Sequence, residues 1–136
     1  MTDSLPKQRR PWILLGLPII FCAAALALPL SATAEGLSAM EVERIEGLIA
    51  AVEHQTDAAF IRNNQAYDST VAAEFLRRKW RAQADRVGSA EDFIEMVASF
   101  SSTSGRPYLI RFGDGREIPC SVFLRTELAR RQRTPK

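Results

Sequence analysis

A polar segment in the last third of the chain carries the clearest chemical signal. Residues 101–107 read Ser-Ser-Thr-Ser-Gly-Arg-Pro, with no apolar side chain except proline. Hydroxyl groups, backbone amides around a glycine and a guanidinium group are donors suited to phosphate or carboxylate. The sequence therefore predicts a site for a small anion, with Arg62 and Tyr108 as added donors. The candidate ligand-binding residues are Ser101, Ser102, Ser104, Arg106, Tyr108 and Arg62.

A second interpretation of the same segment is purely structural. The segment follows a predicted helix C-terminus, where the helix dipole disfavours anions. It is then a C-cap, with Gly105 in a left-handed conformation and serine hydroxyls bonded to the free carbonyls. The residues themselves leave both interpretations open.

The residues that could support catalysis are few. Beyond residue 34 the chain has one cysteine, Cys120, and one histidine, His54. A thiol and an imidazole can form a nucleophile and base pair where a fold joins them, but a lone cysteine is most simply a buried one. We assign no catalytic residue, and we expect no metal and no cofactor because a zinc site needs more ligands than these.

The N-terminus has the three parts of an export signal. Basic residues at 7, 9 and 10 precede an apolar stretch at 12–30, and Ala-Thr-Ala at 32–34 fits signal peptidase. We expect residues 1–34 to be a Sec-type signal peptide and the protein to be periplasmic or secreted. The alternative is an uncleaved anchor in the inner membrane, with the domain outside the cytoplasm.

The charge balance excludes one class of partner. Residues 35–136 hold 15 Lys and Arg against 15 Asp and Glu, which provides no global basic footprint for nucleic acid. A basic C-terminal tail from about residue 125 has five basic residues and one acid. At most, we expect this tail to make weak contact with anionic lipid head groups. Nucleic acid is not an expected partner.

Apolar side chains with helical spacing predict the elements that must position these residues. A first helix begins at the capping box 38–41. The second runs from Asp68 or Ser69 to Gly88, and its apolar stripe includes Phe75. Its other face is solvated and carries Arg77, Arg78 and Arg81, with expected pairs of Glu74 with Arg78 and Arg81 with Asp85. A third helix begins at Ser89 and buries the stripe Phe93, Met96, Val97 and Phe100.

Alternation predicts a β-hairpin after the polar segment. A strand at 108–112 and a second at 116–118 flank Gly-Asp-Gly. A three-residue loop places Arg111 opposite Glu117 and Ile110 opposite Ile118. A last helix starts at Cys120 or Ser121, and residues 60–65 are interpreted as a packed connecting loop. The prediction is one α+β domain over 35–136, a small helical domain of three to four helices with one antiparallel β-hairpin.

Four segments of the sequence resemble the YfeK-like family of small exported bacterial proteins. They are Phe60 to Asn63, Phe75 to Lys79, Ala90 to Ile94 and Ala98 to Tyr108, the last similar to a Ser-Ser-x-x-Gly-Lys-Pro-Tyr pattern with Arg106 in place of the lysine. The likeness covers about 39 to 128. The family is one of unknown function, so the resemblance implies export and a single domain, and no reaction.

The functional expectation combines these points. We expect a non-enzymatic binding or accessory module of the cell envelope, whose partner is an envelope protein or a small anionic ligand. The alternative is a thiol-dependent enzyme or redox partner that uses Cys120.

Overall fold

The computed structural model describes residues 37–134. The predicted signal peptide, its cleavage after Ala34 and its anchor alternative lie outside these residues. No helix within 37–134 has the length and hydropathy needed to cross a membrane. The elements are α1 (Ala39–Glu53), β1 (Ala59–Arg62), β2 (Gln65–Tyr67), α2 (Ser69–Arg81), the 3₁₀ turn η1 (Ala84–Arg86), α3 (Ala90–Asp92), the π-helix η2 (Phe93–Ala98), β3 (Leu109–Arg111), β4 (Glu117–Pro119) and α4 (Cys120–Arg133). The predicted α+β class is confirmed.

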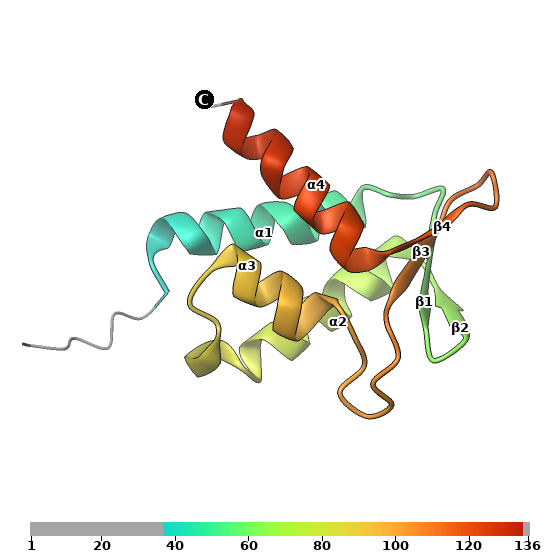
Figure 1. Ribbon diagram of the computed structural model, residues 1–136, viewed down its shortest axis with the longest axis horizontal. Helices are drawn as coiled ribbons and strands as arrows, with labels where there is room; N and C mark the ends of the chain where they lie inside the picture. The colour runs from blue at the N-terminus through green and yellow to red at the C-terminus, as the bar shows by residue number, and fades with distance from the viewer. Residues whose placement is uncertain (1–36, 135–136) are drawn as a thin grey trace, which may run out of the picture. The chain divides into compact units, whose positions relative to one another are not determined.

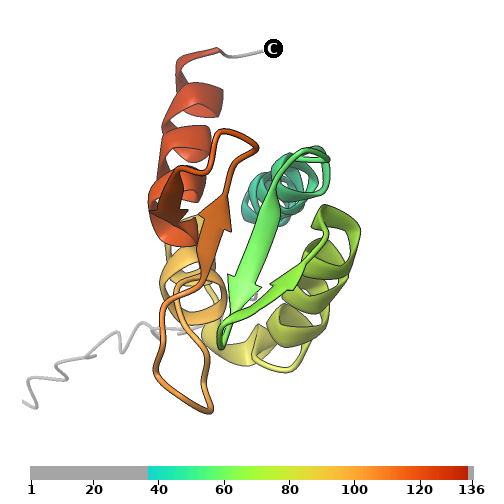
Figure 2. The same ribbon diagram turned by 90° about the vertical axis from the view of Figure 1, so that its right-hand side faces the viewer.

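The sheet has four antiparallel strands in the order β2-β1-β3-β4, with the helices on one of its faces (Figures 1 and 2). The predicted hairpin is β3-β4, and its register is confirmed: Ile110 lies opposite Ile118, and Arg111 opposite Glu117. The arginine and glutamate of that pair form an ion pair of 2.6 Å.

A second hairpin replaces the loop that was expected at 60–65. Phe60 lies opposite Tyr67, so this segment forms β1 and the start of β2, and the loop interpretation is wrong. Asn63 and Asn64 have φ of 51° and 66°, the left-handed pair that a tight β-hairpin turn requires and that asparagine tolerates. Strand β1 also pairs with β3, which makes it a central strand.

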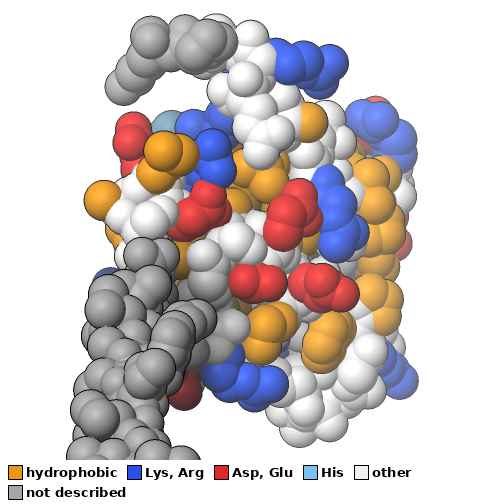
Figure 3. Space-filling view, turned by 60° about the vertical axis from the view of Figure 1, so that its left-hand side comes forward, with side chains coloured by type: hydrophobic (Ala, Val, Ile, Leu, Met, Phe, Trp, Pro, Cys, Tyr) orange, Lys and Arg blue, Asp and Glu red, His pale blue; other side chains and the backbone are white. Residues whose placement is uncertain are grey.

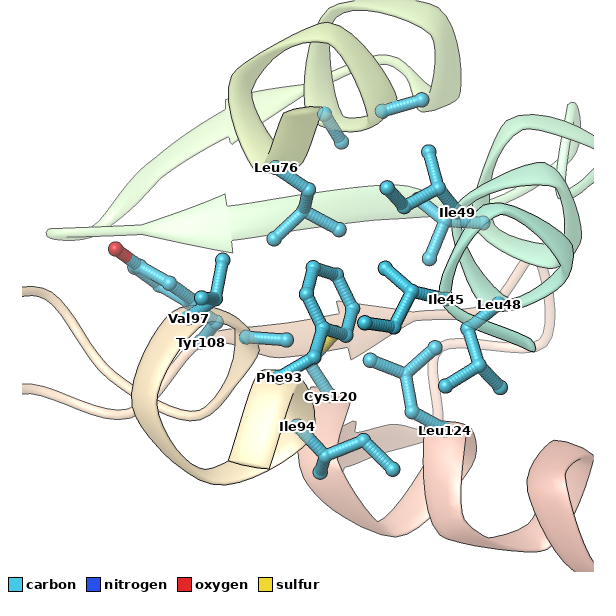
Figure 4. Close-up of a cluster of buried hydrophobic side chains, with 14 of the residues drawn as sticks. Ile45, Leu48, Ile49, Leu76, Phe93, Ile94, Val97, Tyr108, Cys120 and Leu124 are labelled. Atoms are coloured by element: carbon cyan, nitrogen blue, oxygen red, sulfur yellow. The ribbon is translucent and has the colours of Figure 1, made fainter. Parts of the chain in front are cut away.

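The core lies between the helices and the sheet. The predicted stripe of α1 is fully buried at Ile45, Leu48, Ile49 and Val52. Phe60 and Ile110 are adjacent on neighbouring strands and point their side chains into the same cluster. Figure 4 shows Phe93 reaching the middle of this cluster, between side chains from α1, α2 and α4.

Side-chain caps start the helices as predicted at three positions. The amide of Glu41 donates to Ser38 Oγ, that of Val71 to Asp68 Oδ1 and that of Asp92 to Ser89 Oγ. The reciprocal half of the first capping box is wrong. Glu41 instead accepts a 2.6 Å hydrogen bond from the amide of Ala90 and bonds Arg44, because its carboxylate turns toward the start of α3.

Two helices differ from their predicted extents. The helix α2 ends at Arg81 rather than at Gly88, because the amide of Gln83 bonds the carbonyl of Trp80 three residues back. The chain then turns so that Val87 returns to the core. The third helix becomes the π-helix η2, whose wider turn buries 93, 94, 97 and 98 and leaves Phe100, expected in the stripe, exposed.

The last helix begins at Cys120, as predicted, where the cysteine amide donates to the carbonyl of Tyr108 at 2.8 Å. The basic residues expected in a tail continue this helix as far as Arg133. Leu124 and Leu128 bury its inner side. Basic and acidic side chains lie interspersed on the face of the domain shown in Figure 3, in keeping with the balanced charge of the sequence.

Candidate functional site

The serine-rich segment forms an ordered loop between η2 and β3. The amide of Ser101 donates to the carbonyl of Arg106 at 2.9 Å, and that of Gly105 donates to the carbonyl of Ser101 at 2.8 Å. Gly105 has a φ of +68°, so the left-handed glycine of the C-cap interpretation is confirmed. The Ser101 side chain is buried, whereas Ser102 and Ser104 are exposed.

Lysine, rather than a serine of residues 101–107, bonds the carbonyls of Val97 and Phe100 at the end of η2. Lys79 Nζ on α2 donates to the carbonyls of Val97 and Phe100 at 2.8 and 2.7 Å, and to the hydroxyl of Tyr108 at 3.4 Å. The expectation that serine hydroxyls of the loop bond the free carbonyls is therefore wrong at these two groups, although Ser99 Oγ, just before the loop, donates to the carbonyl of Ile94 at 2.6 Å. A cation suits this position because the C-terminus of a helix has a partial negative charge.

Serine hydroxyls connect the loop to the β1-β2 turn instead. Ser104 Oγ donates to Asn63 Oδ1 at 2.5 Å, and Asn63 Nδ2 donates to Ser101 Oγ at 3.5 Å. Arg106 lies at the rim of this junction and lines a shallow depression of about 350 Å³. The other lining residues of the depression are Ile61, Asn63, Asn64, Pro107 and Leu109.

Two of the candidate residues line a different pocket. Arg62 and Tyr108 belong to a pocket of about 110 Å³ between the sheet and α2. The side chain of Tyr108 lies beside Ser101, which joins this side of the site. The structure therefore brings Arg62, Tyr108 and Ser101 together and places Arg106 elsewhere. The pocket is lined by Phe60, Ile61, Arg62, Tyr67, Val71, Ala72, Phe75, Leu76, Arg78, Tyr108 and Cys120.

Cations and aromatic rings alternate around this pocket. The guanidinium of Arg62 lies 4.5 Å from the centroid of the Phe75 ring, and that of Arg78 lies 5.9 Å from it. Tyr108 meets Phe75 edge to face at 5.9 Å, and Lys79 Nζ lies 5.1 Å from the centroid of the Tyr108 ring. We call these five residues the cation-aromatic cluster. Such contacts stabilise a cation without neutralising its charge.

The three cations of the cluster have no acidic partner. Within residues 37–134, no carboxylate oxygen lies within 4.0 Å of Arg62, Arg78 or Lys79. The predicted pair between Glu74 and Arg78 is thus not formed. By contrast, Arg77 on the same helix bonds Glu46 and Glu53 of α1. The cluster is a local excess of positive charge in a domain whose total charge is balanced.

Burial and, to a lesser degree, neighbouring charge shift the pKa values of Lys79 and Tyr108 in the cluster. Burial, followed by the charge of Arg62, lowers the pKa of Lys79 to about 8. Burial raises the pKa of Tyr108, while Arg62 and the Ser101 hydroxyl act in the opposite direction. In addition, Arg62 Nε is buried and has no hydrogen-bond partner among the described residues. An anion bound here would compensate the positive charge of the cluster and would accept hydrogen bonds from its donors.

The lowered pKa of Lys79 gives a direct prediction. In a protein labelled with ¹³C at the lysine ε carbon, we expect the Lys79 resonance to titrate with a midpoint of about 8. The chain has three lysines, and the Lys79→Arg variant identifies the resonance. A midpoint at the ordinary lysine value near 10.5 would contradict the burial of this group.

The lowered pKa of Lys79 also predicts the direction in which the free energy of unfolding changes with pH. The unfolded chain, with its ordinary lysine pKa, binds more protons above pH 8 than the folded chain, so the free energy of unfolding rises from pH 8 to 9. Above pH 9 the buried thiol of Cys120 opposes this rise, because its folded pKa is raised. Urea unfolding at pH 7, 8 and 9 measures the effect, and Lys79→Arg should remove it because arginine stays charged.

The thiol and the imidazole are not brought together. Cys120 is buried in the core at the start of α4, and burial raises the pKa of its thiol to about 12. His54 is exposed at the C-cap of α1. Across residues 37–134, no group of three His, Cys, Asp or Glu side chains gathers in a way that could hold a metal ion.

Sequence reasoning missed the residues that complete the cluster. Phe75 was interpreted as part of the apolar stripe and Arg78 as part of a solvated face, and Lys79 was given no role. The available signal was their spacing, because positions three and four residues after Phe75 return to the same side of a helix.

Comparison with known proteins gives a family without an assigned activity. The family described as "Family of unknown function (DUF5329)" matches residues 39–132. The "Uncharacterized protein YfeK" of Salmonella typhimurium is 38% identical over 90 residues, which cover 66% of this chain and 74% of that protein. No solved structure matches the chain significantly.

Proposed function

This chain belongs to the DUF5329 family of unknown function, as its resemblance to YfeK-like proteins indicated. We propose that its folded domain is an exported, non-enzymatic module that binds a small anionic ligand. The observation that carries the proposal is the cation-aromatic cluster. Two cations, Arg62 and Arg78, line one pocket, and a third, Lys79, lies over the ring of the lining residue Tyr108. Within residues 37–134, none of the three forms an ion pair with a carboxylate.

The cations of the cluster have no carboxylate partner within residues 37–134, which favours the binding of an anion. Partly buried cations without a counter-charge are costly, and burial, followed by the charge of Arg62, lowers the pKa of Lys79. A bound anion offsets the excess positive charge and accepts hydrogen bonds from the guanidinium groups that line the pocket. Hydrogen bonds between oppositely charged groups are stronger than those between neutral groups, so even a small anion can bind here with measurable affinity.

The proposed location rests on the N-terminal sequence. The basic, apolar and small-residue parts of residues 1–34 support export by a Sec-type signal and release into the periplasm or medium. Retention as an inner-membrane anchor is the alternative. The intact mass of the protein from its source cell separates the two, because cleavage leaves a chain that begins at Glu35. The same spectrum under native conditions would reveal a retained ligand as extra mass.

Calorimetric titration with a panel of anions tests binding. The panel is acetate, benzoate, hexanoate, sulfate and inorganic phosphate, each against sodium chloride of matched ionic strength. We expect at least one of them to bind, and its affinity to fall about tenfold or more in Arg62→Gln, because a charge-assisted hydrogen bond is lost. Arg81→Gln is the control, since Arg81 is exposed at the end of α2 and lines neither pocket.

The outcomes divide the candidate residues. Loss of binding in Arg62→Gln with no change in Arg81→Gln supports the pocket beside α2. Loss of binding in Arg106→Gln alone would move the site to the depression on the other side of the sheet and overturn this choice of pocket. Absence of binding by every anion in the panel would reject the proposed function.

A further inference from the structure

Resting on the proposed function, the geometry points to the class of ligand: we propose a small carboxylate with an unbranched apolar tail. The carboxylate bonds Arg62 and Arg78 at the mouth of the pocket, and the tail enters the space between β1 and α2. The inference goes beyond anion binding because it assigns the apolar part of the pocket a role.

The pocket has a charged mouth and an apolar floor. Arg78 is exposed and Arg62 is half-buried, whereas the lining residues Ala72, Leu76 and Cys120 are buried. The ring of Phe75 joins the two regions, since both guanidinium groups lie over it. A ligand that satisfies the whole pocket therefore has a charge at one end and hydrocarbon at the other.

The floor is unsuited to water. Its side chains offer no strong hydrogen-bonding group, and the thiol of Cys120 is a weak donor held in its neutral form by a pKa of about 12. A buried water needs two to four polar partners. Hydrocarbon is the material that the floor accepts at least cost.

The volume limits the length of the tail. A cavity of roughly 150 Å³ lined by apolar side chains holds one benzene molecule. A pocket of about 110 Å³ therefore has room for an apolar group of about four or five carbons. Longer tails have to leave their last carbons in solvent.

The head group follows from the donors. A guanidinium binds a carboxylate through two parallel hydrogen bonds, and Arg62 and Arg78 both line the pocket without an acidic partner among residues 37–134. A phosphate monoester makes similar contacts, but its second charge is costlier to remove from water beside the ring of Phe75. We therefore choose the carboxylate and keep the phosphate as a test.

Calorimetry with four probes separates head group from tail. The probes are hexanoate, acetate, hexan-1-ol and hexyl phosphate, titrated into the purified full-length protein. Each buried methylene is worth about fourfold in affinity, so we expect hexanoate to bind at least about tenfold more tightly than acetate. We expect the same margin over hexan-1-ol, because the alcohol lacks the charge. Decanoate should gain little over hexanoate.

Variants at the mouth locate the bound carboxylate. Val71 lines the pocket and is 43% exposed, so Val71→Asp adds a negative charge without disturbing the core. We expect it to weaken hexanoate about tenfold or more and to affect hexan-1-ol less, because only the carboxylate is repelled. Val71→Asn is the neutral control, and urea unfolding checks that both variants are folded.

Each alternative result has a distinct meaning. Acetate that binds as tightly as hexanoate, with loss in Arg62→Gln, would overturn the apolar tail and leave the proposed function intact. Hexyl phosphate that binds tenfold more tightly than hexanoate would overturn the choice of head group. If none of the anions binds, the proposed function fails together with this inference.

Discussion

Replacement of Phe93 by alanine should lower the free energy of unfolding by about 3 to 5 kcal/mol, the range for loss of a buried phenylalanine. Its side chain has no exposed surface and lies at the centre of the core (Figure 4). It also meets the ring of Trp80 edge to face at 6.0 Å. Domains of this size have a total stability of about 5 to 15 kcal/mol, so the variant will be near the limit of folding.

Urea unfolding measures this loss, and the chain offers a matched control. Phe100 follows the same π-helix but is 42% exposed. We expect Phe100→Ala to cost about half as much as Phe93→Ala or less, because a large part of the Phe100 ring is already in contact with water. Equal losses for the two variants would mean that η2 does not direct Phe93 into the core.

The local elements could be predicted because their signals are local. The four apolar positions of α1 recur with helical spacing and are fully buried. The caps at Ser38, Asp68 and Ser89 depend on a hydroxyl or carboxylate that reaches an amide three residues on. The register of β3-β4 follows from matching Arg111 with Glu117 across a short turn. None of these needs knowledge of the rest of the fold.

The first hairpin was missed because its strands give little pattern. They have four and three residues, and buried positions do not alternate along either one. Much of the support for β1 comes from β3, where Phe60 lies opposite Ile110, fifty residues further along the chain. The asparagine pair at 63–64 was a turn signal, but a turn alone does not specify that strands flank it.

The residues predicted to form one site lie in two separate places, and sequence alone could not show this for a similar reason. Nearness in sequence grouped Arg106 with Tyr108, but Arg106 still belongs to the loop before β3, and the structure separates these two between the depression and the pocket. The partners of Tyr108 come from α2, in Phe75 and Lys79. Their meeting depends on how α2 packs on the sheet, which no local pattern predicts.

The thiol of Cys120 should react with a disulfide reagent at neutral pH at least about a thousandfold more slowly in the native protein than in urea. Burial raises its pKa from 9.0 to about 12, and each pKa unit lowers the reactive thiolate tenfold at a pH below both values. The side chain is also only 2% exposed, so the reagent meets it only after an opening of the structure.

The measurement uses the full chain with Cys22→Ser, which leaves Cys120 as the single thiol. Reaction of the native thiol within seconds would favour the alternative of a thiol-dependent enzyme or redox partner and contradict the binding module. A slow reaction would instead allow the reaction rate of Cys120 to be used as a measure of ligand binding in the pocket. Because Cys120 lines the pocket beside α2, saturating hexanoate should slow the native reaction further and leave the rate in urea unchanged. A native rate unaffected by bound hexanoate would place the ligand outside this pocket.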